Sequence, residues 1–309
     1  MLSLPIRVLG YLLEFVPPNE VYRLKLVNKA WYQRIKMVAK NGISLGKEHA
    51  LRHGMIETVI LIKDEINPKS GNDLAHACSS GSMALVNFVL YLYMRAPEPR
   101  PQFLRMLSQA LCDASGGGHL AIVKKLMNLG AIDINDAIFH ACINSKFEVI
   151  EYLLDTCEWH PKMMYELCKL VKIECIKFVS DYIIQTSRQK RFMWDEGLQG
   201  AHVHGRDDVI NLMLEYGASN WGMAFLGACE GGDFNRIQSI IQNHEIDRDY
   251  WIWGFYKTCK YCSIDVVKLV HTELIHDGYR LYCFEINDAH FNARNNSKDV
   301  IEYLRSVLI

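Results

Sequence analysis

A short apolar pattern that recurs along the chain limits its possible folds more than any other feature of the sequence. Each copy has a Leu, Ile or Phe, then Ala-Cys or a similar small pair, then a Gly position, and finally a branched apolar pair. The clearest copies begin at Leu74, Leu111, Ile138, Leu198, Phe225 and Phe255, and weaker ones begin at His49, Met164 and Phe291. The Gly positions lie 26 to 37 residues apart, and about nine copies with this spacing predict a solenoid.

Each copy has the pattern of two short helices joined by a turn. Leu74, Ala77 and Cys78 are spaced to share one face of a first helix, and the Gly position four residues after the Ala suits a left-handed helix end. A second helix with its own apolar stripe follows. Neighbouring copies must pack together to bury these stripes, so the predicted fold class is all-α. The Ala position places a small side chain where the next copy must approach closely. It is filled by Ala77, Ala114, Ala141, Ala201 and Ala228.

The repeat resembles the ankyrin consensus from about residue 45 to residue 309. The match is best in the run from Gly118-His119 to Leu126, and Gly130-Ala131 and Tyr216-Gly217-Ala218 end two copies in the ankyrin manner. The Thr-Pro-Leu-His opening of that family is missing throughout, and several copies have about 27 residues. We therefore expect an ankyrin-type α-solenoid whose connecting hairpins are shortened or absent.

The N-terminal residues do not fit the repeat. Val8, Leu9 and Leu12 predict an amphipathic helix that ends at Pro17, and a second apolar helix follows. We therefore expect two parts, a helical motif at residues 1–40 and the repeat array at residues 41–309.

The N-terminal motif resembles an F-box, from Leu4-Pro5 through the Phe15-Val16-Pro17 exit to the Leu26-Val27-Asn28-Lys29 run that precedes Trp31. The resemblance implies docking on the SKP-type linker subunit of a cullin–RING ubiquitin ligase. Arg7 departs from the family, which often has Glu there. The alternative is that these helices only cap the array. The partner-binding residues that the resemblance implies are Leu4, Pro5, Val8, Leu9, Leu12, Pro17, Leu24, Val27 and Trp31.

The cysteines and histidines occupy repeat positions, which favours packing over catalysis. Cys259 and Cys262 form a CxxC pair with His271 and His276 downstream, so zinc is an alternative, but both cysteines fill regular positions of the eighth copy. No phosphate loop, G-x-S-x-G or H-E-x-x-H motif occurs. We therefore expect no enzyme activity, no metal and no cofactor. One cysteine per copy follows the Ala position, at Cys78, Cys142, Cys168, Cys229 and Cys259.

Charge and hydropathy narrow the class of partner. The formal net charge is −1, from 34 basic and 35 acidic residues, so neither nucleic acid nor an anionic membrane is the expected partner. No secretory signal and no long uncharged apolar run occur. We therefore expect an intracellular protein with reduced thiols, in the cytoplasm or nucleus. The combination of F-box and shortened repeats resembles proteins that large DNA viruses of amoebae encode in families, which implies a host cell.

Five residues are candidates for binding a target protein, because Arg and Trp are favoured interface anchors. Arg188, Arg191 and Trp194 lie in a basic and aromatic insertion, for which a solvated loop is the alternative. Trp251 and Trp253 lie at the head of the eighth copy, for which core packing is the alternative.

Two functions from different classes remain. The first is a substrate-recruiting adaptor of a cullin–RING ligase, which catalyses nothing itself. The second is a stand-alone ankyrin-repeat scaffold or inhibitor with no link to ubiquitin.

Overall fold

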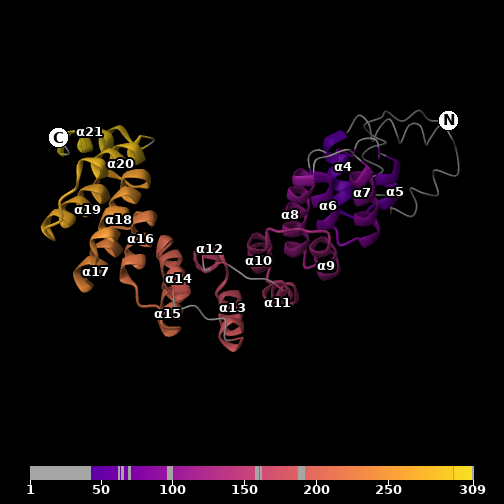
Figure 1. Ribbon diagram of the computed structural model, residues 1–309, viewed down its shortest axis with the longest axis horizontal. Helices are drawn as coiled ribbons and strands as arrows, with labels where there is room; N and C mark the ends of the chain where they lie inside the picture. The colour runs from indigo at the N-terminus through magenta and orange to yellow at the C-terminus, as the bar shows by residue number, and fades with distance from the viewer. Residues whose placement is uncertain are drawn as a thin grey trace, which may run out of the picture. The chain divides into compact units, whose positions relative to one another are not determined.

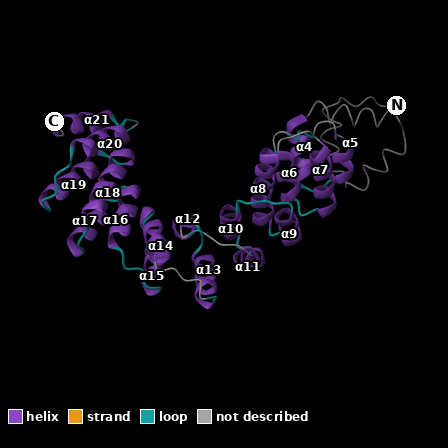
Figure 2. Ribbon diagram, in the orientation of Figure 1, coloured by secondary structure: helices purple, strands orange, loops and turns teal. Residues whose placement is uncertain are grey.

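The computed structural model describes residues 43–61, 63, 66–68, 71–95, 100–156, 160, 162–186, 192–294 and 296–307. In this part of the chain the regular structure is helical and no strand occurs (Figures 1 and 2). The predicted all-α class is confirmed. The predicted motif at residues 1–40 lies outside the described residues.

The chain divides into two compact units, Met1–Glu158 and Trp159–Ile309, a division that the sequence did not indicate. We call them the first unit and the second unit. The first unit contains α4 (Ile43–Arg52), α5 (Ile56–Leu61), α6 (Asn72–Ser79), α7 (Met83–Arg95), α8 (Arg100–Gly117), α9 (Leu120–Asn128), α10 (Ile134–Ile143) and α11 (Phe147–Thr156). The second unit contains α12 (Lys162–Leu170), α13 (Ile173–Gln185), α14 (Phe192–Val203), α15 (Asp207–Glu215), α16 (Trp221–Gly231), α17 (Phe234–Asn243), α18 (Arg248–Tyr261), α19 (Ile264–His276), α20 (Cys283–Ala293) and α21 (Lys298–Val307).

The described helices form nine consecutive pairs, one for each copy of the repeat. The first helix of a pair carries the Leu and Ala-Cys pattern, and the second carries the branched pair. First helices pack on one another in chain order, α4 to α10 in the first unit and α12 to α20 in the second, and each also packs on its own second helix. Each unit is therefore a stack of helix pairs with a continuous row of first helices (Figure 1).

Small residues set the spacing between neighbouring first helices. All five residues at the Ala position are completely buried. In the second unit, glycines allow an even closer approach. A Cβ atom added at Gly200 of α14 would collide with the carbonyl oxygen of Tyr165 on α12, and one at Gly227 of α16 would collide with that of Gln199 on α14. At these two glycines, the backbones of consecutive first helices therefore pack directly against each other.

The Gly position ends the first helix as the sequence predicts. Gly81, Gly118 and Gly205 have φ angles of 75°, 81° and 62°, in the left-handed region where a Cβ atom is unfavourable. Ser145, which fills this position in the fourth copy, also adopts a left-handed φ of 55°. Cys262 fills it in the eighth copy with φ −107°, so that helix ends in an extended residue instead.

Side chains of the turn form hydrogen bonds with backbone carbonyl groups at the C-terminal end of the first helix in the preceding pair. His119 Nε2 lies 3.0 Å from the carbonyl oxygen of Ser79, and Arg206 Nη1 donates to that of Cys168 at 2.9 Å. Asn296 Nδ2 does the same for Cys259 at 2.8 Å. Because the last carbonyl groups of a helix have no partner within it, these bonds satisfy groups that packing would otherwise leave unpaired.

The first prediction concerns the backbone contact at Gly200. Gly200→Ala should lower the free energy of unfolding by about 1–3 kcal/mol, because the new methyl group must push α14 away from α12. Urea unfolding followed by circular dichroism measures the change.

Gly116→Ala is the matched control, because its Cβ atom would meet only the exposed Asn144 side chain within 3.4 Å. Alanine there should be neutral or stabilising by up to about 1 kcal/mol through its higher helix propensity. Equal stability of Gly200→Ala and the wild type would contradict the close packing.

Candidate functional site

Most of the predicted partner-binding residues lie outside the described residues. This applies to Leu4, Pro5, Val8, Leu9, Leu12, Pro17, Leu24, Val27 and Trp31, and to Arg188 and Arg191. Their contacts stay predictions from the sequence.

Two of the three tryptophans predicted to meet a target lie in the core. Trp194 is 1% exposed and stacks on Tyr216, with 5.1 Å between ring centroids. It does not belong to a solvated loop, because α14 begins at Phe192 and turns this side chain inward. Trp251 is completely buried and packs on Phe225 in a T-shaped contact. Core packing removes both indoles from the surface that a partner could contact.

Trp253, in contrast, is 54% exposed on α18. Residues two apart on a helix point about 200° from each other, so the burial of Trp251 turns Trp253 towards solvent. The Trp253 ring meets Tyr250 edge-on, with 6.2 Å between centroids. Of the three candidates for target binding that the structure describes, Trp253 is the one that lies at a surface.

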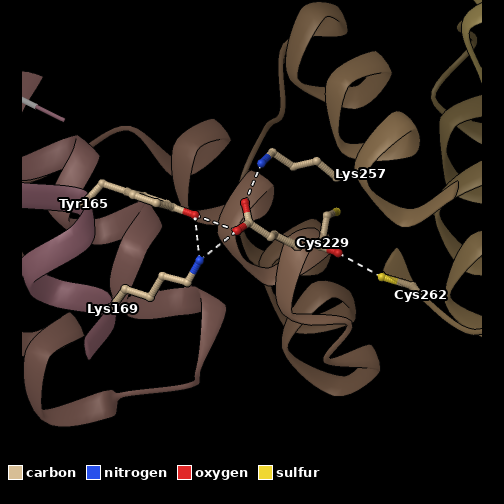
Figure 3. A network of polar contacts seen from close by, with 6 residues as sticks. Tyr165, Lys169, Cys229, Lys257 and Cys262 are labelled. Carbon is tan, nitrogen blue, oxygen red and sulfur yellow. Dashed lines mark hydrogen bonds and ion pairs between the residues drawn. The ribbon is translucent and has the colours of Figure 1, made fainter. Parts of the chain in front are cut away.

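A polar network that the sequence did not reveal begins one helical turn from Trp253. Its centre is the carboxylate of Glu230 on α16, on which the labelled side chains of Tyr165, Lys169 and Lys257 converge (Figure 3). Tyr165 Oη and Lys169 Nζ, both from α12, donate to Glu230 Oε1 at 2.6 and 3.1 Å. Lys257 Nζ, from α18, donates to Glu230 Oε2 at 2.5 Å. Residues from three helices therefore share one carboxylate.

This network depends on the absence of a side chain at Gly200 of α14. In the row of first helices α14 lies between α12 and α16, yet side chains of α12 and α16 still meet. Gly200 of α14 has no Cβ atom to hold Tyr165 away. The network could not be inferred from the sequence, because its residues lie 61 to 65 positions apart between α12 and α16 and no motif marks them.

Electrostatics fix the protonation state of the network. Burial by itself would raise the pKa of Glu230, but hydrogen bonds from Lys257, Tyr165 and Lys169 outweigh it and lower that pKa to about 2. Burial and the bond to Glu230 raise the pKa of Tyr165 above its ordinary value. Neither group is suited to exchange protons near neutral pH, so the arrangement suits binding and stability rather than acid–base catalysis.

The cysteines of the shared repeat position are all buried, as a packing role requires. Burial raises the pKa of the Cys78, Cys168, Cys229 and Cys259 thiols, which makes them poor nucleophiles.

Two residues of the zinc alternative, Cys262 and His271, have other contacts. Cys262 Sγ donates to the carbonyl oxygen of Cys229 at 3.0 Å (Figure 3). His271 stacks on Phe255, and its Nδ1 lies 2.9 Å from Tyr303 Oη. Among the residues that the structure describes, no group of three or more His, Cys, Asp or Glu could hold a metal ion. These contacts favour packing for Cys262 and His271, and complete burial favours it for Cys259.

The second prediction follows from the lowered pKa of Glu230. Because the folded pKa lies below the ordinary carboxyl value of 4.5, the carboxylate stabilises the fold fully above that pH, and this stabilisation is lost as the pH falls towards 2. Glu230→Gln should therefore lower the free energy of unfolding by about 2 kcal/mol at pH 7 and by much less at pH 3. Urea unfolding at pH 7, 5 and 3 checks this.

Glu166→Gln on α12 is the control for a nearby carboxylate outside the network, and we expect it to have little effect at any of these pH values. A deficit of Glu230→Gln that is the same at pH 3 as at pH 7 would show that the charge of Glu230 does not stabilise the fold.

Comparison with known proteins adds one finding. The F-box domain family model matches residues 1–41. No curated protein matches the chain. In the described part of the chain, none of the helices has both the length and the apolar character needed to cross a membrane.

Proposed function

We propose that this chain is a substrate-recruiting adaptor of an SCF-type cullin–RING ubiquitin ligase. The observation that carries the proposal is the F-box domain match at residues 1–41. An F-box domain in general indicates a ubiquitin-ligase adaptor rather than an enzyme. In this proposal Leu4, Pro5, Leu9, Leu12 and Pro17 contact the SKP-type subunit, and Val27 and Trp31 hold the motif together.

The stack of helix pairs is the proposed target-binding half, and we propose that it is an ankyrin-type solenoid. The fully buried Ala positions and the left-handed Gly positions support this assignment. Because the described residues contain no strand, target recognition falls to the helices and their turns rather than to β-fingers. Solenoids present extended surfaces of this kind to protein partners.

The proposed setting is the cytoplasm or nucleus, in a host cell if the resemblance to proteins of large DNA viruses of amoebae holds. Buried thiols with raised pKa values suit a reducing compartment, since they pack as small apolar groups without needing a disulfide.

A stand-alone scaffold or inhibitor is the second candidate. The exposed Trp253 favours the stand-alone scaffold, because this residue belongs to the second unit and lies outside residues 1–41.

The third prediction separates the two functions. The full chain should co-purify with an SKP-type subunit and its cullin, whereas Leu4→Asp with Pro5→Ala, or removal of residues 1–40, should abolish co-purification. A charged side chain at Leu4 would disrupt an apolar docking contact. Pull-down of the purified proteins, with circular dichroism to show that the helices persist, makes the measurement.

Trp253→Ala is the control, because Trp253 belongs to the second unit and should leave SKP-type binding unchanged. Failure of the wild-type chain to bind, or equal binding by the Leu4 and Pro5 variant, would favour the stand-alone scaffold.

A further inference from the structure

His202, on α14, is a buried histidine that packing leaves without a hydrogen bond. It is 3% exposed, and among the described residues no group bonds either ring nitrogen, Nδ1 or Nε2. A neutral imidazole has one N–H donor and one acceptor, whereas a protonated ring has two donors and a full charge. An unpaired charge costs far more to bury than an unpaired neutral group. The position of His202 therefore favours the neutral ring.

Backbone contacts on both sides of His202 close the space between α14 and α16. A Cβ atom added at Gly227 of α16 would collide with the carbonyl oxygen of Gln199 and would lie 2.9 Å from the Cβ atom of His202. One added at Gly231 would collide with the carbonyl oxygen of Val203. Water can therefore enter between α14 and α16 at His202 only if the two helices separate.

The two carboxylates that act on the ring already have a partner. They belong to Asp207, in the first turn of α15, and to Asp233, the N-cap of α17. Arg236 holds them through ion pairs of 2.9 and 3.5 Å. Burial lowers the pKa of His202 from its ordinary value of 6.5 to about 4, and the positive charge of Arg236 acts in the same direction.

Charged groups on the other elements next to α14 are also engaged. Lys169 of α12 and Glu230 of α16 pair with each other. Arg206, in the turn between α14 and α15, donates to the carbonyl oxygen of Cys168. A protonated His202 would therefore add a positive charge that these contacts do not compensate.

We propose that the packing of α14 on α16 is an acid-sensitive joint of the second unit, held closed by the neutral ring of His202 and opened when that ring is protonated. Opening lets water hydrate the charged ring at the expense of the backbone contacts at Gly227 and Gly231. Because the pKa of the packed ring lies below 6.5, the joint is fully stable above that pH and loses stability as the pH falls towards 4. The joint belongs to the second unit and requires neither an F-box partner nor a target.

The fourth prediction is that acid loosens α14 and α16 in the full-length chain. Amide hydrogen–deuterium exchange, corrected for the intrinsic effect of pH on exchange, measures the opening of each helix. Opening should increase about thirtyfold from pH 7.5 to pH 5, the factor that a fall of the pKa from 6.5 to about 4 implies. His202→Gln, whose side chain stays uncharged, should show a much smaller increase. In the wild-type chain, a carbon-13 NMR titration of the histidine rings should show His202 half-protonated well below pH 6.

His204→Gln is the matched control, because His204 is exposed and lies two residues further along the chain. It should loosen with acid as the wild type does. Burial also lowers the pKa values of His244 and His271, so the difference between His202→Gln and the wild type reports on the joint. The proposal is overturned if His202 is half-protonated at or above pH 6.5, or if His202→Gln loosens as much as the wild type. Should His202→Gln not fold, the ring titration in the wild-type chain decides alone.

Discussion

The backbone contact between consecutive first helices is the constraint on which the rest of the structure depends. It requires Ala or Gly where one first helix meets the next, as at Ala201, Gly200 and Gly227. A helix pair of this size cannot bury its apolar face alone, so each unit gains its core from neighbours in the row. The left-handed turns at the Gly positions then return the chain for the second helix, and turn side chains such as Arg206 bond the helix end that the turn exposes.

The same constraint shapes the surface of the second unit. Because Gly200 lets α14 lie close to α12, Tyr165 and Lys169 reach Glu230 on α16, and Lys257 reaches it from α18. The carboxylate is stabilised by three donors, which together outweigh the cost of its burial. A partly buried carboxylate thereby holds two lysines from separate helices in place.

The proposed function divides between the ends of the sequence. Residues 1–41 match the F-box domain, which in general indicates a ligase adaptor. In the helix stack, the shifted pKa values of Glu230 and Tyr165 do not suit acid–base catalysis near neutral pH. An adaptor needs two binding surfaces and no active site. Among the described candidates for target binding, Trp253 is the anchor that lies at a surface.

The sequence by itself determined the helical class, the nine helix pairs and the positions of their turns, because short-range spacing fixes these features. Ala77 and Gly118 could be assigned to a packing face and a left-handed turn from their neighbours alone. Only the tertiary structure decided that Trp194 and Trp251 are buried while Trp253 is exposed, and that Glu230 joins α12 to α18. Both outcomes depend on how closely separate helices approach. Two helix faces meet through residues about 60 positions apart, and no local pattern in the chain encodes that distance.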